Sequence, residues 1–228
     1  MSHTPRAGVA LVHGIAQAGL ALAKELRTRG YSLVVSDDQP TDAKRALADE
    51  LEAQFVAAPD SAALERLVAD ADLLCPAPGV PETHVIFDIA RSHETPVRTE
   101  IDLAYEWEQQ RVGGPRPILA ITGTDGKTTT TLLAAHLLNH AGVKAAAVGN
   151  TEVPFVAALH DDVDVFVVEC SSFRLQFTES FRAEASVWLN LAPDHQNWHR
   201  SMESYEAAKA RMWAHNRPTD VAVGFAAD

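Results

Sequence analysis

Glycine, lysine and threonine residues gather in the segment 122–131, directly after an apolar run at 118–122. Glycines allow the backbone to turn so that several N–H groups point at one anion, and a helix that begins there adds partial positive charge. In such a loop Lys127 would contact the β- and γ-phosphates of a nucleoside triphosphate, and the Thr128 hydroxyl would bind Mg²⁺. The residues predicted to contact ATP are Gly123, Thr124, Asp125, Gly126, Lys127, Thr128 and Thr129.

This loop is a variant of the common phosphate-binding pattern, because Ile121 stands where that pattern has a glycine and Gly123 follows instead. The alternative is an ordinary strand-to-helix turn rich in threonine. A lysine just inside a helix start opposes the helix dipole. Since a bound polyphosphate would compensate that charge, Lys127 favours the phosphate interpretation.

Acidic and imidazole side chains follow apolar runs further along the chain. Glu169 ends the run 165–169, and Asp194 and His195 come shortly after the run 187–191. Because the carboxyl ends of parallel strands meet at one edge of a sheet, Glu169 and His195 predict a second divalent-cation site beside the phosphate loop. The alternative for Glu169 is an exposed residue at a strand end. Lys209 lies in a helical pattern, and that pattern alone favours a solvated lysine.

The elements that must position these residues alternate between apolar runs and amphipathic stretches, as in β-α units on a parallel sheet. The Gly- and Pro-rich segment 111–117 separates two such series and predicts an α/β protein with domains 1–112 and 113–228. In the first series, the expected strands are 8–13, 31–36 and 73–75, and the expected helices are 18–29, 41–52, 83–92 and 101–110. In the second series, the expected strands are 118–122, 144–148, 163–169, 185–191 and 221–224, and the expected helices are 128–140, 154–159 and 202–213.

Composition excludes several classes of protein. A formal net charge of −12 over 228 residues argues against a general nucleic-acid binder, which needs Lys and Arg to meet phosphates. Cys75 and Cys170 sit in apolar segments without metal or disulfide spacing, and we expect both to be packing residues in a reducing compartment. The sequence has no apolar run long enough for a membrane helix and no signal-peptide pattern, so we expect a soluble, cytoplasmic protein.

Five segments together resemble the Mur ligases of peptidoglycan synthesis in order and spacing: 122–130, 149–150, 169–175, 190–195 and 205–209. Within that family, Ser171, Ser172 and Phe173 after the glutamate resemble the branch that adds D-glutamate. The resemblance implies a Rossmann-like N-terminal domain and a P-loop ATPase-type central domain. It also implies that Lys127, Glu169, His195 and Lys209 are catalytic, with Mg²⁺ bound by Thr128, Glu169, His195 and a Lys209 carbamylated by CO₂.

The resemblance further implies a site for a UDP-linked substrate. A glycine-containing turn at 14–19 is similar to the family's uridine-nucleotide loop. The chain departs from the family's pattern at four positions, which are Ala16, Ala77, Asp125 and Arg174. The residues expected to bind this substrate are Gly14, Gln17, Ala18, Asp37, Gly79, Asn150 and Ser171.

The implied reaction is ATP-dependent addition of D-glutamate to UDP-N-acetylmuramoyl-L-alanine through an acyl phosphate, by a monomer that binds neither nucleic acid nor membrane. The resemblance covers the N-terminal domain and most of the central domain, so we expect a shortened form that lacks the family's third domain and is inactive alone. The alternatives are another branch of the family, a folylpolyglutamate synthase, or a non-catalytic UDP-nucleotide-binding module.

Overall fold

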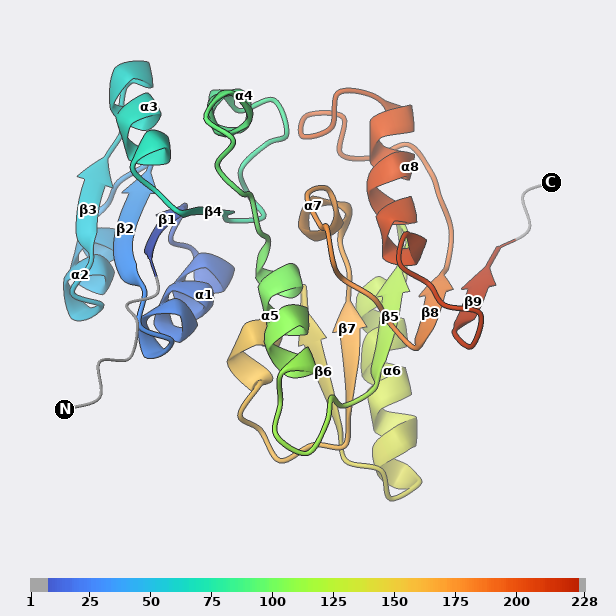
Figure 1. Ribbon diagram of the computed structural model, residues 1–228. Helices are drawn as coiled ribbons and strands as arrows, with labels where there is room; N and C mark the ends of the chain where they lie inside the picture. Colours follow the sequence, from blue (N-terminus) through green and yellow to red (C-terminus); the bar gives the residue numbers. More distant parts are fainter. Residues whose placement is uncertain (1–7, 226–228) are drawn as a thin grey trace. The chain divides into compact units, whose positions relative to one another are not determined.

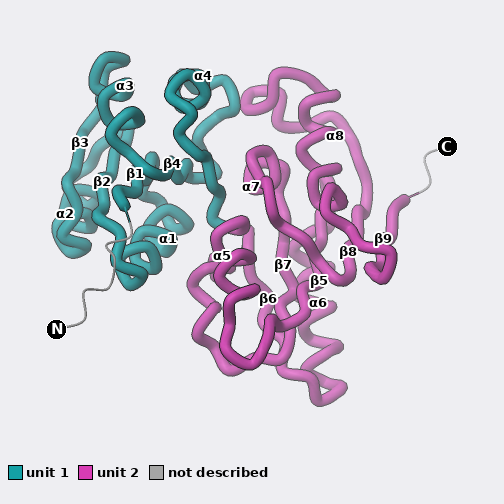
Figure 2. Tube along the Cα trace, viewed as in Figure 1, with its two compact units in different colours: residues 1–100 teal, residues 101–228 magenta. Residues whose placement is uncertain are grey.

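The computed structural model describes residues 8–225, which form two compact units, 1–100 and 101–228 (Figure 2). Each unit is an α/β structure built on its own parallel sheet. The prediction that the chain has no signal peptide rests on its first residues. These residues lie outside the described part of the chain. Among the described residues, every helix is too short or too polar to cross a membrane.

The first unit is a four-stranded parallel sheet in the order β3-β2-β1-β4 (Figure 1). Strand β1 lies inside the sheet, and its residues Ala10, Leu11 and Val12 are fully buried, as expected for a strand covered on both faces. The strands are β1 Val9–His13, β2 Ser32–Asp37, β3 Gln54–Ala57 and β4 Leu73–Pro76. The helices are α1 Gln17–Thr28, α2 Asp42–Glu50, α3 Ser61–Ala69 and α4 Val85–Ser92.

The second unit is a five-stranded parallel sheet in the order β6-β7-β5-β8-β9. This order places β5 between β7 and β8, so that the carboxyl ends of these three strands are adjacent. The strands are β5 Ile118–Thr122, β6 Ala145–Gly149, β7 Val165–Glu169, β8 Ala185–Trp188 and β9 Val221–Gly224. The helical elements are α5 Glu100–Gln109, α6 Lys127–His140, η1 Phe155–Ala158, α7 Ser172–Leu175, α8 Met202–Ala210 and η2 Arg211–Trp213.

Helix α6 is held against this sheet by an apolar cluster. Ile121 from β5, Ala135 from α6 and Val167 from β7 are buried together. Figure 1 shows α7 and α8 at the end of the sheet to which the strand arrows point. The loops after β5, β7 and β8 therefore lie at the carboxyl end of the sheet, together with the starts of α6 and α7. Ligands bind at this end in open α/β sheets.

Helix α5 groups with the second unit, because its side chains anchor there. The Asp102 carboxylate accepts hydrogen bonds from the amides of Glu179, Ser180 and Phe181 at 2.7, 3.1 and 2.9 Å. Glu108 and Arg116 form a buried ion pair with a 2.7 Å separation between Oε2 and Nη2. The compact units thus divide at residue 100, whereas the domain boundary between 112 and 113 stays a prediction.

Most predicted elements are present within a few residues of their expected bounds, but three were missed: β3, α3 and the short helix α7. The helix expected at 154–159 is a 3₁₀ turn, Phe155–Ala158. The strand expected at 185–191 ends at Trp188. Beyond it, Asn190 leaves the sheet to bond the loop after β5, with its Oδ1 atom 2.9 Å from the amide nitrogen of Thr124.

Candidate active site

The loop between β5 and α6 has the conformation that the phosphate interpretation requires. Gly126 has a φ of 79°, which glycine adopts without the steric cost that other residues incur. Helix α6 begins at Lys127, and its first amide groups have no carbonyl partner within the helix. Thr128 and Thr129 are exposed at this end of the helix. The loop and helix start therefore present backbone donors and hydroxyls to solvent, where a polyphosphate would bind.

Asn190 holds the first half of the loop in place. Its Oδ1 atom accepts hydrogen bonds from the amides of Thr124 and Asp125, each at 2.9 Å. The Thr124 hydroxyl accepts from the Ala192 amide at 2.9 Å and lies 3.2 Å from the Tyr205 hydroxyl. Through these bonds, the segment after β8 fixes the shape of the loop. The sequence motif contained Asn190, but its clamping role was missed, since it depends on a contact between distant strand ends.

Two ammonium groups are anchored on consecutive carbonyls of this loop. Lys127 Nζ donates to the Thr124 carbonyl at 2.7 Å, and Lys209 Nζ donates to the Gly123 carbonyl at 2.6 Å. Lys209 is only 1% exposed, so the expectation of a solvated lysine is wrong. Burial, followed by the positive charge of Lys127, lowers the pKa of Lys209 to about 7.

A lysine with such a pKa is partly neutral near pH 7, and the neutral amine is the form that reacts with an electrophile such as CO₂. Helix α8 supplies Lys209 from its last turn, one helical turn after Tyr205. The ammonium of Lys209 lies 4.5 Å from the centre of the Tyr205 ring. Burial and the cationic neighbour together favour loss of the proton.

Glu169 is buried at the end of β7, with 1% of its surface exposed, so the alternative of an exposed strand-end residue is wrong. Its Oε1 atom accepts from the Asn150 side-chain amide at 3.1 Å. Among the described residues, its buried Oε2 atom has no hydrogen-bond partner. A buried carboxylate oxygen without a donor is suited to a hard cation such as Mg²⁺, which binds oxygen ligands. The residues present therefore fit the cation that the sequence predicts.

Gly149 brings the backbone of β6 close to Glu169. Its φ is 100°, and a Cβ atom added there would lie 2.4 Å from the Glu169 carbonyl oxygen. Only glycine fits this position. The Asn150 amide then donates to the same carbonyl at 2.9 Å, so that Asn150 bonds Glu169 through both backbone and side chain.

His195 lies in the loop after β8 with its side chain 37% exposed. Its Nε2 atom is 3.4 Å from Asp194 Oδ2, and its ring centre is 4.6 Å from that of Phe173 and 6.0 Å from that of Tyr205. Since Lys209 also contacts Tyr205, this ring is a shared neighbour of His195 and Lys209. His199, by contrast, is buried with its Nε2 atom 2.9 Å from the Ser172 hydroxyl, as a packing residue would be.

Ser171 follows Glu169 closely and begins helix α7. Its hydroxyl accepts from the Arg174 amide at 3.4 Å, and the residue is 6% exposed. Cys170, between Glu169 and Ser171, is fully buried with its Sγ atom 3.6 Å from the Val168 carbonyl oxygen, and Cys75 in the first unit is also fully buried. The interpretation of both cysteines as packing residues is confirmed.

The first unit contains the predicted uridine-nucleotide loop. Gly14 has a φ of 90°, and a Cβ atom there would lie 2.8 Å from the Ala77 side chain, so the turn requires glycine. Gln17 is exposed at the start of α1, Ala18 is buried, and Gly79 is exposed with open space around it.

Asp37 has internal partners at both carboxylate oxygens. Oδ2 accepts from the Ile15 amide at 3.1 Å, and Oδ1 accepts from the Gln39 amide at 2.9 Å and from Lys44 Nζ at 2.7 Å. The carboxylate therefore fixes the turn between β1 and α1. Its contact with a substrate stays a prediction.

The sequence comparisons point to one family. Residues 121–228 match the Mur ligase middle domain. The chain is 38% identical over 209 residues to the UDP-N-acetylmuramoylalanine–D-glutamate ligase of Streptomyces coelicolor, covering 90% of this chain and 44% of that enzyme. It is 37% identical over 216 residues to the enzyme of the same name from Thermus thermophilus, covering 93% and 48%. The chain thus spans less than half the length of these curated relatives.

Two solved structures share the fold. The UDP-N-acetylmuramate:L-alanyl-gamma-D-glutamyl-meso-diaminopimelate ligase of Neisseria meningitides matches with a TM-score of 0.58 and 15% identity, covering 96% of this chain and 71% of that one. A murein peptide ligase of Psychrobacter arcticus matches with a TM-score of 0.54 and 16% identity, covering 96% and 49%. With its middle-domain match over residues 121–228 and its D-glutamate ligase relatives, the chain carries the middle domain of the Mur ligase family, and its fold agrees with this.

Proposed function

We propose that this chain serves the cytoplasmic, ATP-dependent addition of D-glutamate to UDP-N-acetylmuramoyl-L-alanine, a reaction that the names of its relatives describe in part. One observation carries the proposal. The buried Lys209 is bonded to the phosphate loop, and Glu169 at the end of the neighbouring strand β7 has a buried oxygen that meets no hydrogen-bond partner in the described part of the chain. This arrangement provides charge for a triphosphate and an oxygen ligand for a cation. We infer that the protein acts as a monomer on small molecules, without nucleic acid or membrane.

The loop residues supply the contacts with ATP. The amides of α6 and the ammonium of Lys127 would neutralise the phosphate oxygens, and the Thr128 hydroxyl would be a ligand for Mg²⁺. Glu169 and His195 would hold a second Mg²⁺. Bound Mg²⁺ supplies further neutralisation of the charge that develops on the transferred phosphoryl group.

Lys209 acquires a role if its amine reacts with CO₂. The neutral nitrogen attacks the carbon of CO₂, one C–N bond forms, and one proton is released, so that a cation becomes a carboxylate. That carboxylate would support the metal and the γ-phosphate. The pKa of about 7 supports this step, since the neutral amine is available near neutral pH.

The substrate carboxylate then attacks the γ-phosphorus, ADP leaves, and an acyl phosphate forms. The amine of D-glutamate attacks the acyl carbon, and phosphate leaves the new amide. Ser171 and Asn150 would orient the muramoyl substrate and the γ-phosphate, and Gly14, Gln17, Ala18, Asp37 and Gly79 would bind the UDP portion. Positioning and electrostatic stabilisation account for most of the acceleration in such a site.

The choice of D-glutamate is tested by phosphate release with a panel of amino acids. Since the chain spans less than half of its relatives' length, it is assayed alone and with the remaining carboxyl-terminal segment of the Thermus thermophilus relative added. With that segment added, we expect phosphate release with UDP-N-acetylmuramoyl-L-alanine and D-glutamate. We expect no phosphate release in the Lys127→Ala variant. Release only with another amino acid would support another branch, and release with a folate substrate would support a folylpolyglutamate synthase. Binding of UDP-substrate without ATP binding would support a non-catalytic module.

A further inference from the structure

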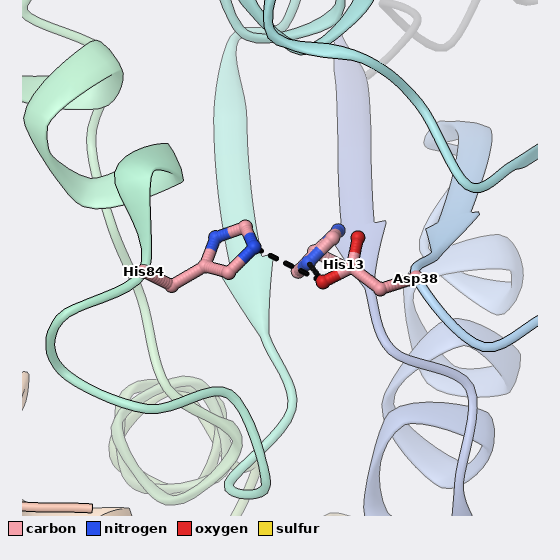
Figure 3. A group of neighbouring side chains, drawn as sticks. All are labelled: His13, Asp38 and His84. Atoms are coloured by element: carbon pink, nitrogen blue, oxygen red, sulfur yellow. Dashed lines mark ion pairs between the residues drawn. The ribbon is translucent and has the colours of Figure 1, made fainter.

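Three side chains of the kinds that bind metals meet at the carboxyl end of the sheet in the first unit: His13, Asp38 and His84 (Figure 3). Their ligating atoms all lie within 4.8 Å of one another, and no other such group occurs among the described residues 8–225. His13 ends β1, Asp38 follows β2, and His84 is the residue before α4. Three separate elements thus converge on one point.

We propose that His13, Asp38 and His84 form a binding site for one divalent transition-metal ion of the Zn²⁺ class. Asp38 Oδ2 lies 3.5 Å from His13 Nε2 and 3.0 Å from His84 Nε2. Ligands at about 2.0–2.1 Å from a tetrahedral Zn²⁺ are separated from each other by about 3.3 Å. The two separations from Asp38 are therefore close to this spacing, the two imidazoles offer ligating atoms within 4.8 Å of each other, and water would complete the coordination.

The chemistry of the donors selects the class of metal. Two imidazoles and one carboxylate suit Zn²⁺, Co²⁺ or Ni²⁺, whereas Mg²⁺ and Ca²⁺ prefer sites made of oxygen alone. His13 is 1% exposed, and burial is the main cause that lowers its pKa, so its ring is neutral and able to ligate. Its Nδ1 atom lies 2.8 Å from the Ser36 hydroxyl, which orients the ring with Nε2 toward Asp38. In metal-ligating histidines, the ring nitrogen that does not bind the metal typically makes such a hydrogen bond.

Metal binding at His84 would change the hydrogen bond that caps α4. Its Nδ1 atom accepts a hydrogen bond from the Ile86 amide at 3.2 Å, which caps α4. A neutral ring with an acceptor at Nδ1 carries its hydrogen at Nε2, from which it donates to Asp38. A metal at Nε2 displaces that hydrogen, and the ring's one N–H then lies at Nδ1, where it opposes the Ile86 amide. Metal binding therefore breaks the capping bond and loosens the first turn of α4.

The site is tested with Zn²⁺ alone, titrated into the metal-free 228-residue chain and followed by calorimetry. We expect one Zn²⁺ per chain and no comparable binding of Mg²⁺. Asp38→Asn and His84→Gln should each weaken Zn²⁺ binding more than Ser36→Ala, for which loss of an outer hydrogen bond costs about 10- to 100-fold. Asp38 and His84 have side chains that are 47% and 18% exposed, so these two variants should fold, as circular dichroism would verify.

Two controls keep the result specific. His140→Gln changes an exposed histidine at the end of α6 and should leave Zn²⁺ affinity unchanged. His195→Gln should also leave it unchanged, which separates this site from the proposed Mg²⁺ site. In hydrogen exchange, Zn²⁺ should speed exchange of the Ile86 amide in the wild type and not in Asp38→Asn. Absence of stoichiometric Zn²⁺ binding, or equal affinity in the wild type, Asp38→Asn and His84→Gln, would overturn the proposal.

Discussion

The ammonium of Lys209 donates a hydrogen bond of 2.6 Å to the carbonyl oxygen of Gly123, although the two residues belong to different elements of the second unit. This bond fixes the last turn of α8 to the phosphate loop. It also places a second positive charge beside Lys127, whose Nζ atom bonds the next carbonyl along the loop. Both side chains are therefore held against the loop to which the phosphate site is assigned.

The first prediction concerns reaction of Lys209 with CO₂. Its pKa of about 7 makes the neutral amine dominant above that pH, so at a fixed CO₂ pressure carbamate should increase as the pH rises through 7. Carbon-13 NMR with labelled CO₂ should show a carbamate resonance that disappears in Lys209→Met. It should persist in Lys144→Ala, since Lys144 is an exposed lysine. A resonance that persists in Lys209→Met would show that another amine reacts.

The same pKa predicts how stability depends on pH. Lys209 binds its proton less tightly in the folded protein, where its pKa is about 7, than in the unfolded chain, where the ordinary value is 10.5. Between these values the unfolded state binds more protons, so the free energy of unfolding rises with pH, by up to about 1.4 kcal/mol per pH unit.

Urea unfolding from pH 7 to 10 should therefore show a steeper rise in the wild type than in Lys209→Met, which cannot titrate there. The comparison removes the contribution of the other groups that titrate in this range. Parallel pH profiles for the two proteins would mean that Lys209 is not desolvated in solution.

Removing the Asn190 side chain should release the phosphate loop. Asn190→Ala leaves the amides of Thr124 and Asp125 without their acceptor, at a cost of about 1–3 kcal/mol for each amide that water cannot reach. We expect a lower thermal unfolding temperature and weaker ATP binding. Asn190→Asp is the matched control, because its carboxylate still accepts both bonds but cannot make the 3.2 Å bond that the Asn190 side chain donates to the Asp125 carbonyl, so it should restore part of the stability while its charge weakens ATP binding. Equal unfolding temperatures for Asn190→Ala and the wild type would exclude the clamp.

Gly149 should tolerate no side chain. Gly142 also has a positive φ, 86°, but open space around it, so Gly142→Ala isolates the conformational cost of about 1–2 kcal/mol. Gly149→Ala adds a close contact with the Glu169 carbonyl and should lower the free energy of unfolding by more. Urea titration of both variants makes the comparison. A smaller effect at Gly149 than at Gly142 would contradict the close approach of β6 and β7 at this point.

Local patterns explain which parts of the fold were predictable. The run at 118–122, the glycines after it and the helix beyond it could be predicted because each follows from adjacent residues, and β5 and α6 lie where expected. Strand β3 was missed because its four residues, Gln54–Ala57, are exposed or half-buried and lack the continuous apolar pattern of β1. The burial of Lys209 depends on packing of α8 against a loop far away in the sequence. Its helical pattern could not reveal this.

The candidate sites also differ in how far local sequence patterns could predict them. Glu169 and His195 stay predicted metal ligands, chosen because the carboxyl ends of parallel strands lie together, whereas the clamp by Asn190 depends on one side-chain rotamer. The cluster of His13, Asp38 and His84 has no sequence motif, since its members follow three different elements at irregular spacing. Only the order β2-β1-β4, and the turn that leads from β4 to α4, bring them together.

The loop at 123–129 is assigned to the phosphates of ATP, and calorimetric titration of MgATP into the chain measures that binding. We expect saturable binding in the wild type and in Lys144→Ala, and an affinity at least tenfold lower, about 1.4 kcal/mol, in Lys127→Ala. Binding of the UDP-linked substrate should be the same in all three proteins. Equal MgATP affinity in Lys127→Ala and the wild type would contradict the assignment of the phosphate site.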